Sequence, residues 1–156
     1  MPENRGSQTT EIMPEPIYSD LYTEKVLMLR KQEGSLSESS EAIRHSLSMN
    51  NAVGCIGGYY DDSLSMMFMS GFFMHNLGYD YESFVRDTGG SLRPMIYRDD
   101  LRYFETERFR EGSGAGLFRM VMRDGTPIYV RSFKTESFDS SGTRIWVMAV
   151  RVAWDA

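Results

Sequence analysis

Few side chains in this sequence are of the types that catalyse reactions, and their spacing does not bring them together. The chain has two histidines, His45 and His75, thirty residues apart. It has one cysteine, Cys55, so neither an internal disulfide bond nor a multi-cysteine metal site can form. No pattern pairs a nucleophile with a base, and none has the spacing of a catalytic metal site. The residues therefore predict a protein that is not an enzyme and has no metal site.

Three other features have simpler structural explanations. Asp99 and Asp100 stand where a helix is expected to begin, and carboxylates there accept hydrogen bonds from free N–H groups. Residues 112–116 are glycine-rich, but a phosphate loop leads into the N-terminus of a helix. Here the loop leads from an expected helix into an expected strand, so it is interpreted as a flexible connection. Cys55 is interpreted as a small buried residue of a strand.

The composition predicts a single domain that neither binds nucleic acid nor spans a membrane. The 156 residues have a net charge of −5 and a pI near 5.1, so the chain is poorly suited to neutralise phosphates. No stretch approaches the roughly 18 consecutive apolar residues of a membrane span. Residues 1–16 lack the pattern of a secretion signal. A cytoplasmic location is expected, because the single cysteine fits a reducing compartment.

Hydrophobic periodicity predicts an N-terminal arm, two flanking helices and then a larger region of mixed structure. Residues 1–16 contain three of the five prolines and are expected to be a disordered arm. Residues 20–34 and 35–50 are expected to form two amphipathic helices, within a flanking segment that spans residues 17–51.

From residue 52 the pattern changes to short strands and helices. Strands are expected at residues 53–60 and 65–70, and helices at 71–77, 81–87 and 99–112. Alternating apolar residues and the turn dipeptide Asp124-Gly125 predict three further strands, at residues 117–123, 128–138 and 144–152. Consecutive hairpins imply antiparallel pairing, so we expect an α+β domain with the helices on one face of the sheet.

Four local patterns between residues 70 and 130 together resemble those of one family. Ser70, Phe73, Gly78 and Tyr79 are similar to an "N-x-x-F-x-x-x-x-G-Y" helix, which Glu82 and Phe84 follow. Residues 97–100 are similar to an "H-P-D-D" helix entry, and residues 118–130 to an "R-x-x-x-x-D-G-x-x-x-W-V" hairpin. In this order, over residues 52–154, they resemble the PAS domain, a sensor module of bacterial signalling proteins.

The resemblance implies a fold and a general role. It implies a five-stranded antiparallel sheet of order 2-1-5-4-3 with short helices on one face, preceded by flanking helices that often dimerise. It also implies a sensory module at the input end of a larger signalling protein, such as a histidine kinase or a cyclic-dinucleotide enzyme. The cysteine motif of the flavin-photosensor branch is missing, and His75 is the only histidine of the region. Neither haem nor a covalent flavin is therefore expected, and the identity of any other cofactor stays open.

Methionine is unusually frequent, with 12 in the chain and eight of them in the PAS-like region. Unbranched thioethers either fill an irregular core or form an adaptable cavity with the aromatic residues for a small apolar ligand. The candidate pocket residues are Phe68, Phe72, Met74, Phe84, Met95, Phe104, Phe118, Met120, Met122, Trp146 and Met148.

The flanking helices are expected to bury their apolar stripes in a homodimer with two-fold symmetry. The candidate contacts are Val26, Leu29, Ile43 and Leu47. The leading hypothesis is therefore a non-catalytic sensory module that binds a ligand or dimerises. A structural adaptor with a filled core is the main alternative, and an enzyme that uses the same pocket is a weaker one.

Overall fold

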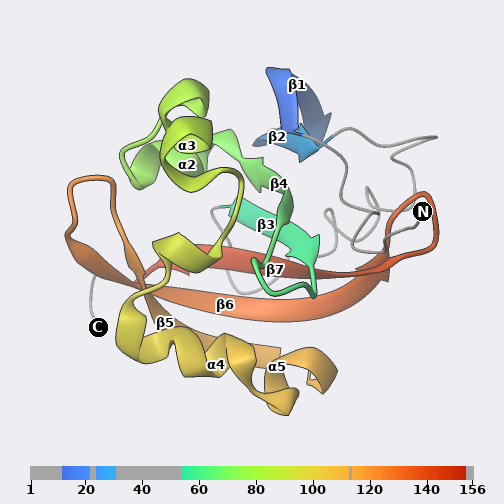
Figure 1. Cartoon of the computed structure of the whole chain (residues 1–156), viewed down its shortest axis with the longest axis vertical. Coiled ribbons are helices and arrows are strands. Elements are labelled where there is room, and N and C mark those ends of the chain that lie inside the picture. Colours follow the sequence, from blue (N-terminus) through green and yellow to red (C-terminus); the bar gives the residue numbers. More distant parts are fainter. Residues whose placement is uncertain (1–11, 22–23, 31–53, 113, 154–156) are drawn as a thin grey trace.

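The computed structural model describes residues 12–21, 24–30, 54–112 and 114–153. They form an antiparallel sheet with short helices over one face, shown in Figure 1. The strands are β1 (Ile12–Leu21), β2 (Glu24–Arg30), β3 (Gly54–Tyr59), β4 (Met66–Ser70), β5 (Gly114–Val121), β6 (Pro127–Phe138) and β7 (Arg144–Val152). The helices are α2 (Gly71–Asn76), α3 (Tyr81–Thr88), α4 (Leu101–Glu105) and α5 (Glu107–Glu111), with short 3-10 turns η2 (Arg93–Met95) and η3 (Arg98–Asp100).

The sheet contains the expected five-stranded core and two additional strands. Its order is β1-β2-β4-β3-β7-β6-β5. Counted from β3, the last five strands have the order 2-1-5-4-3, which confirms the predicted α+β class and core topology. The two N-terminal strands extend this core beyond β4, where β2 pairs with β4.

The C-terminal hairpins confirm the strands expected from alternation. β5 pairs with β6 up to Val121 and Pro127, and Gly125 turns the chain with φ +93°. The Asp124 carboxylate accepts a hydrogen bond from the Thr126 backbone N–H at 2.9 Å, which closes the turn. In Figure 1, β5, β6 and β7 lie side by side beside α4 and α5.

The prediction of a disordered arm is wrong for residues 12–16, which belong to β1. Pro14 and Pro16 are tolerated because β1 is the edge strand, where a missing N–H breaks no central pairing. The register shifts between Ile12 and Ile17, around these prolines. Residues 1–11 lie outside the described part of the chain.

The helix predicted for residues 20–34 is also wrong, because residues 24–30 form β2 between β1 and β4. Leu27 and Leu29 pack on the helix-covered face of the sheet, while Val26 and Met28 pack on the opposite face. Val26 and Leu29 are fully buried within their own chain, so they do not form the exposed stripe proposed for dimerisation. The second predicted helix, with Ile43 and Leu47, lies outside the described residues.

The helix predicted for residues 99–112 is divided. Thr106 adopts an extended conformation and separates α4 from α5. The two segments bury Phe104 and Phe109 respectively, so the break turns both aromatic rings toward the sheet. Asp100 is the N-cap residue of α4, but its side chain makes no capping hydrogen bond. The capping interpretation is therefore wrong for Asp100, whose carboxylate binds Arg119 instead.

Two apolar clusters lie on the two faces of the sheet. The larger is between the sheet and the helices and includes Phe73 of α2, Phe84 of α3 and Trp146 of β7. The smaller is on the opposite face and includes Cys55 and Phe68. We call them the helix-side core and the opposite core. A register shift between Gly57 and Gly58 places Met67 and Phe68 together in the opposite core.

Candidate ligand pocket

Most of the pocket residues expected from the sequence meet in the helix-side core. They come from strands β5 and β7, from the turn η2, and from helices α2, α3 and α4. Each is at most 3% exposed. These eight residues are Met74, Phe84, Met95, Phe104, Phe118, Met120, Trp146 and Met148.

Three of the expected pocket residues lie outside the helix-side core. Phe68 packs in the opposite core, because the bulge in β4 turns its side chain away from the helices. Phe72 follows the last residue of β4 by two positions and is 57% exposed, so it does not contribute to the core. Met122 follows β5 and is only partly buried.

Aromatic rings fill much of the space between α4, α5 and the sheet. The Phe104 ring centroid lies 4.8 Å from that of Phe109 and 5.0 Å from that of Phe118. Phe109 in turn lies 6.0 Å from Trp146. These edge-to-face and tilted contacts are favourable geometries, and they make this part of the core a closely packed layer.

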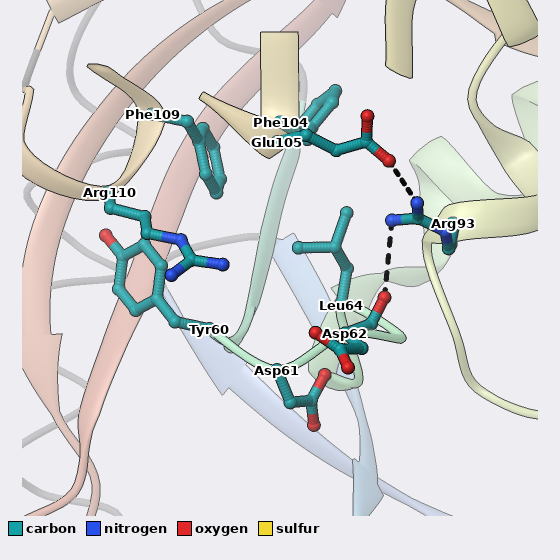
Figure 2. A pocket seen from close by; sticks show the side chains of 9 residues that line it. All are labelled: Tyr60, Asp61, Asp62, Leu64, Arg93, Phe104, Glu105, Phe109 and Arg110. Atoms are coloured by element: carbon teal, nitrogen blue, oxygen red, sulfur yellow. Dashed lines mark hydrogen bonds and ion pairs between the residues drawn. The ribbon is translucent and has the colours of Figure 1, made fainter. Parts of the chain in front are cut away.

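A pocket of about 320 Å³ lies at one edge of this aromatic layer. Its walls come from the end of β3, the β3–β4 turn, η2, α4 and α5, as Figure 2 shows. Phe104, Phe109 and Leu64 are apolar and almost completely buried beneath it. The remaining lining residues are Tyr60, Asp61, Asp62, Arg93, Glu105 and Arg110.

The β3–β4 turn is held in an unusual conformation at the pocket. Leu64 has φ +52°, and it is the one non-glycine residue with positive φ in the described part of the chain. A branched side chain rarely adopts this left-handed conformation without compensation. Here the Leu64 N–H donates to the Asp61 carbonyl at 3.0 Å, and the Asp61 carboxylate accepts from the Ser65 N–H at 2.9 Å. The turn therefore presents Leu64 to the pocket in one fixed position.

The charged side chains around the pocket differ in their partners. Arg93 forms an ion pair with Glu105 and also donates to the Asp62 carbonyl oxygen, and both contacts are drawn in Figure 2. Arg110 lies on the other side of the view, beside Tyr60, with its guanidinium directed inward. Within the described residues, the Arg110 guanidinium has no hydrogen-bond or ion-pair partner.

A polar network of buried Lys134, half-buried Tyr60 and Glu136, and exposed Arg144 lies behind the wall formed by Tyr60. The Lys134 ammonium is 3.1 Å from the Tyr60 hydroxyl, 3.2 Å from the Glu136 carboxylate and 4.2 Å from the Phe109 ring centroid. The Tyr60 hydroxyl also donates to Glu136, which accepts from Arg144 at 2.7 Å. The network joins the pocket wall on β3 to strands β6 and β7.

The pKa shifts in this network fit an ion pair beside a neutral tyrosine. Burial raises the pKa of Tyr60, and its hydrogen bond to Glu136 raises it further, so the phenol keeps its proton. Burial lowers the pKa of Lys134, and the negative charge of Glu136 opposes that change. Burial would raise the pKa of Glu136, but hydrogen bonds from Arg144 and Tyr60 outweigh it and lower the pKa.

Of the eleven candidate pocket residues from the sequence, only Phe104 lines this pocket, and sequence patterns do not reveal the rest of it. Most of its charged residues are exposed or half-buried and show no diagnostic spacing, and Asp61-Asp62 is a common turn dipeptide. Lys134 is the one available signal, since it occupies an inward-facing position in the alternating pattern of β6. A lysine is almost never fully buried unless it is paired, so this position predicts a nearby carboxylate.

The described residues contain no candidate metal site. No group of three or more histidine, cysteine, aspartate or glutamate side chains in the described ranges could hold a metal ion. No helix among them is both long and apolar enough to span a membrane.

Comparisons with known proteins support the fold. No family model matches the chain, and no curated protein matches it in sequence. A solved structure described as "Flavin Analogue Sheds Light on Light-Oxygen-Voltage Domain Mechanism" is similar, with a TM-score of 0.54 and 12% sequence identity. The match covers 78% of this chain and 90% of the other. The light-oxygen-voltage domain is a member of the PAS family, so the likeness agrees with the fold that the sequence patterns implied.

Proposed function

We propose that this chain is a non-catalytic sensory or regulatory module of the PAS type. The most direct support is the pocket between the β3–β4 turn and helices α4 and α5, on a sheet with the PAS strand order. A ligand there would touch the turn, the helices and the end of β3 at once. A ligand that binds one arrangement of these elements more tightly than another shifts the protein toward that arrangement, and this population shift is how a sensor responds.

The module is proposed to be the input part of a larger bacterial signalling protein in the cytoplasm, such as a histidine kinase or a cyclic-dinucleotide enzyme. The four sequence patterns and the matching strand order support this role. The network from Tyr60 through Glu136 to Arg144 offers a physical connection from the pocket to the last strand, β7. The chain downstream of β7 is where an output domain would receive the change.

Native mass spectrometry and thermal unfolding of the purified chain test the proposal. A sensor retains a small molecule through purification, or its Tm rises when one member of a metabolite panel is added. A bare mass together with an unchanged Tm across the panel contradicts ligand sensing. As the matched control, the same panel is added to heat-denatured chain in mass spectrometry, and the denatured chain should retain no compound.

A structural adaptor with a filled core is the second candidate. The closely packed rings of Phe104, Phe109, Phe118 and Trp146 support it, because they leave the centre of the helix-side core occupied. An adaptor requires a partner protein and no ligand. The bare mass and unchanged Tm described above favour this candidate.

A flavin is the cofactor that the structural neighbour suggests. Cys55, the only cysteine of the chain, is fully buried in the opposite core, across the sheet from the helices. Its position does not fit a covalent adduct with a flavin bound beneath the helices. Visible absorbance of concentrated protein tests for haem and for non-covalent flavin, and we expect no band.

We also propose that the chain forms a homodimer through the segment that contains Ile43 and Leu47. Support comes from the apolar stripe of residues 35–50 and from the PAS resemblance. Replacing both residues by aspartate should give monomers in light scattering while the sheet keeps its circular dichroism. A wild-type chain that is monomeric at high concentration contradicts the proposal.

A further inference from the structure

We infer that the pocket binds a small zwitterion, an apolar amino acid or a dipeptide, whose carboxylate is bound by Arg110. The inference rests on the proposed function, because it names the ligand class of the same site. The pocket combines three features that such a ligand matches: an apolar base, one cation without a partner in the described ranges, and two carboxylates of a different element that can accept further hydrogen bonds.

The base of the pocket is suited to an apolar side chain. Phe104, Phe109 and Leu64 are at most 4% exposed, and the pocket lies over them. Contacts with Phe118 and Trp146 hold the two rings from behind, and the hydrogen bonds of the turn hold Leu64. A volume of about 320 Å³ accommodates an amino acid or a dipeptide and is near the lower end for small-molecule sites.

Arg110 provides the cation. Its guanidinium is directed into the pocket and has no partner among the described residues, whereas the nearby cations are already paired. Arg93 is bound to Glu105, Lys134 to Glu136, and Arg144 to Glu136. A free guanidinium beside apolar surface favours a carboxylate, because two parallel N–H groups bind its two oxygens.

The β3–β4 turn provides the carboxylates. Asp62 is exposed, and its carboxylate has no partner in the described part of the chain. Asp61 accepts one backbone hydrogen bond, from Ser65, and its charge also interacts with that of Arg30, but its carboxylate keeps further acceptor capacity. Arg93 and Glu105 of the lining neutralise each other. The charged side chains that remain are Arg110, which is positive, and Asp61 and Asp62, which are negative. Such a rim attracts an ammonium group and repels a ligand whose charges are only negative, such as phosphate.

Ligand binding at Arg110 would reach the sheet directly. Arg144 of β7 donates to the Arg110 carbonyl oxygen and also binds Glu136. A displacement of α5 therefore acts on the same arginine that closes the Tyr60–Glu136 network.

Isothermal titration calorimetry of the full chain tests the inference. The probes are leucine, phenylalanine and the dipeptide Gly-Leu, with three comparison compounds. N-acetyl-leucine lacks the ammonium, leucinamide lacks the carboxylate, and inorganic phosphate is an anion alone. At least one zwitterion should bind. Blocking either its ammonium group or its carboxylate should weaken its binding about tenfold.

Three variants locate the binding. Arg110→Gln should weaken zwitterion binding about tenfold and leave leucinamide binding unchanged, because the amide has no carboxylate to lose. Asp62→Asn should weaken the zwitterion and leave N-acetyl-leucine unchanged. Arg108→Gln is the matched control, since Arg108 is an exposed arginine of the same helix that does not line the pocket, and affinity should change by less than about twofold.

Three results overturn the inference. The first is the absence of zwitterion binding at millimolar concentration, and the second is binding that Arg110→Gln and Arg108→Gln affect equally. The third is tighter binding of phosphate or N-acetyl-leucine than of any zwitterion tested. If a different small molecule is retained in native mass spectrometry, only the ligand class is wrong and the proposed function stands. If no molecule is retained and none raises the Tm, both are wrong.

Discussion

The carboxylate of Asp100 accepts three hydrogen bonds from Arg119 and so fastens the start of α4 to the middle of β5. The donors are the Arg119 backbone N–H at 2.7 Å, Nε at 3.0 Å and Nη2 at 2.8 Å. The guanidinium also lies 4.2 Å from the ring centroid of Tyr97. One aspartate thus positions the helix that forms part of the pocket.

Asp100→Asn should destabilise the fold by about 1 kcal/mol, because a charge-assisted bidentate contact is lost but water screens part of its strength. For a chain of this size, that change lowers the Tm by about 2–4 °C. Asp99→Asn is the matched control, since Asp99 is an exposed neighbour on the same turn. Thermal unfolding measures both variants, and equal shifts in Tm would contradict the assigned role.

The effect of Asp100→Asn should depend on pH. Hydrogen bonds from Arg119 lower the pKa of Asp100 below its ordinary value. A carboxyl group whose pKa is lower in the folded state contributes stability above its unfolded pKa, about 4. That contribution is lost as the pH falls through the lowered pKa of the folded state. The difference in unfolding free energy between wild type and Asp100→Asn should therefore be full at neutral pH and disappear in acid.

The adjacent residues Phe72 and Phe73 should respond very differently to truncation. Phe73 is fully buried in the helix-side core, whereas Phe72 is 57% exposed. Phe73→Ala should cost about 3–5 kcal/mol of unfolding free energy, and Phe72→Ala less than about 0.5 kcal/mol. Each variant is the control for the other in urea denaturation. A large cost for Phe72→Ala would show that this ring is covered in solution.

Gly57 is required because the ring of Phe68 lies directly over it. A Cβ atom built on Gly57 would be 2.2 Å from Phe68 Cζ. Gly57→Ala should therefore cost about 1–3 kcal/mol through overpacking. The same substitution in a Phe68→Ala background should cost clearly less, since the clash is gone. Additive costs in this double-mutant cycle would refute the ring-over-glycine explanation.

The sequence predicted the C-terminal half of the sheet well because two independent signals agree there. Alternation assigns the faces of β5 and β6, and Asp124-Gly125 fixes the turn between them. β2 lacks such a signal, since residues 26–29 are four consecutive apolar residues. A run of this length fits a helix face or a strand buried on both sides, and only its pairing with β4 decides between them.

The pocket could not be predicted for a different reason. Phe104 and Phe109 are five residues apart, which a continuous helix would place on different faces. They converge only because the chain is extended at Thr106, and no residue pattern signals that break. Arg110 and Asp62 are ordinary charged residues in sequence, and only the fold brings them to one pocket.

The ion pair between buried Lys134 and half-buried Glu136 leads to the last prediction, which is that substitutions of the two residues differ in cost. Lys134 is 2% exposed and loses hydration on folding, while Glu136 keeps Tyr60 and Arg144 as partners when the lysine is removed. Lys134→Met should therefore change the unfolding free energy by no more than about 1 kcal/mol, because an apolar chain of similar length replaces a desolvated charge. Glu136→Gln should cost about 2–4 kcal/mol, because it leaves the ammonium buried without its counter-charge. Adding Lys134→Met to Glu136→Gln should then recover most of the loss. Urea denaturation of the three variants measures these changes, and a greater cost for Lys134→Met than for Glu136→Gln would contradict the assignment.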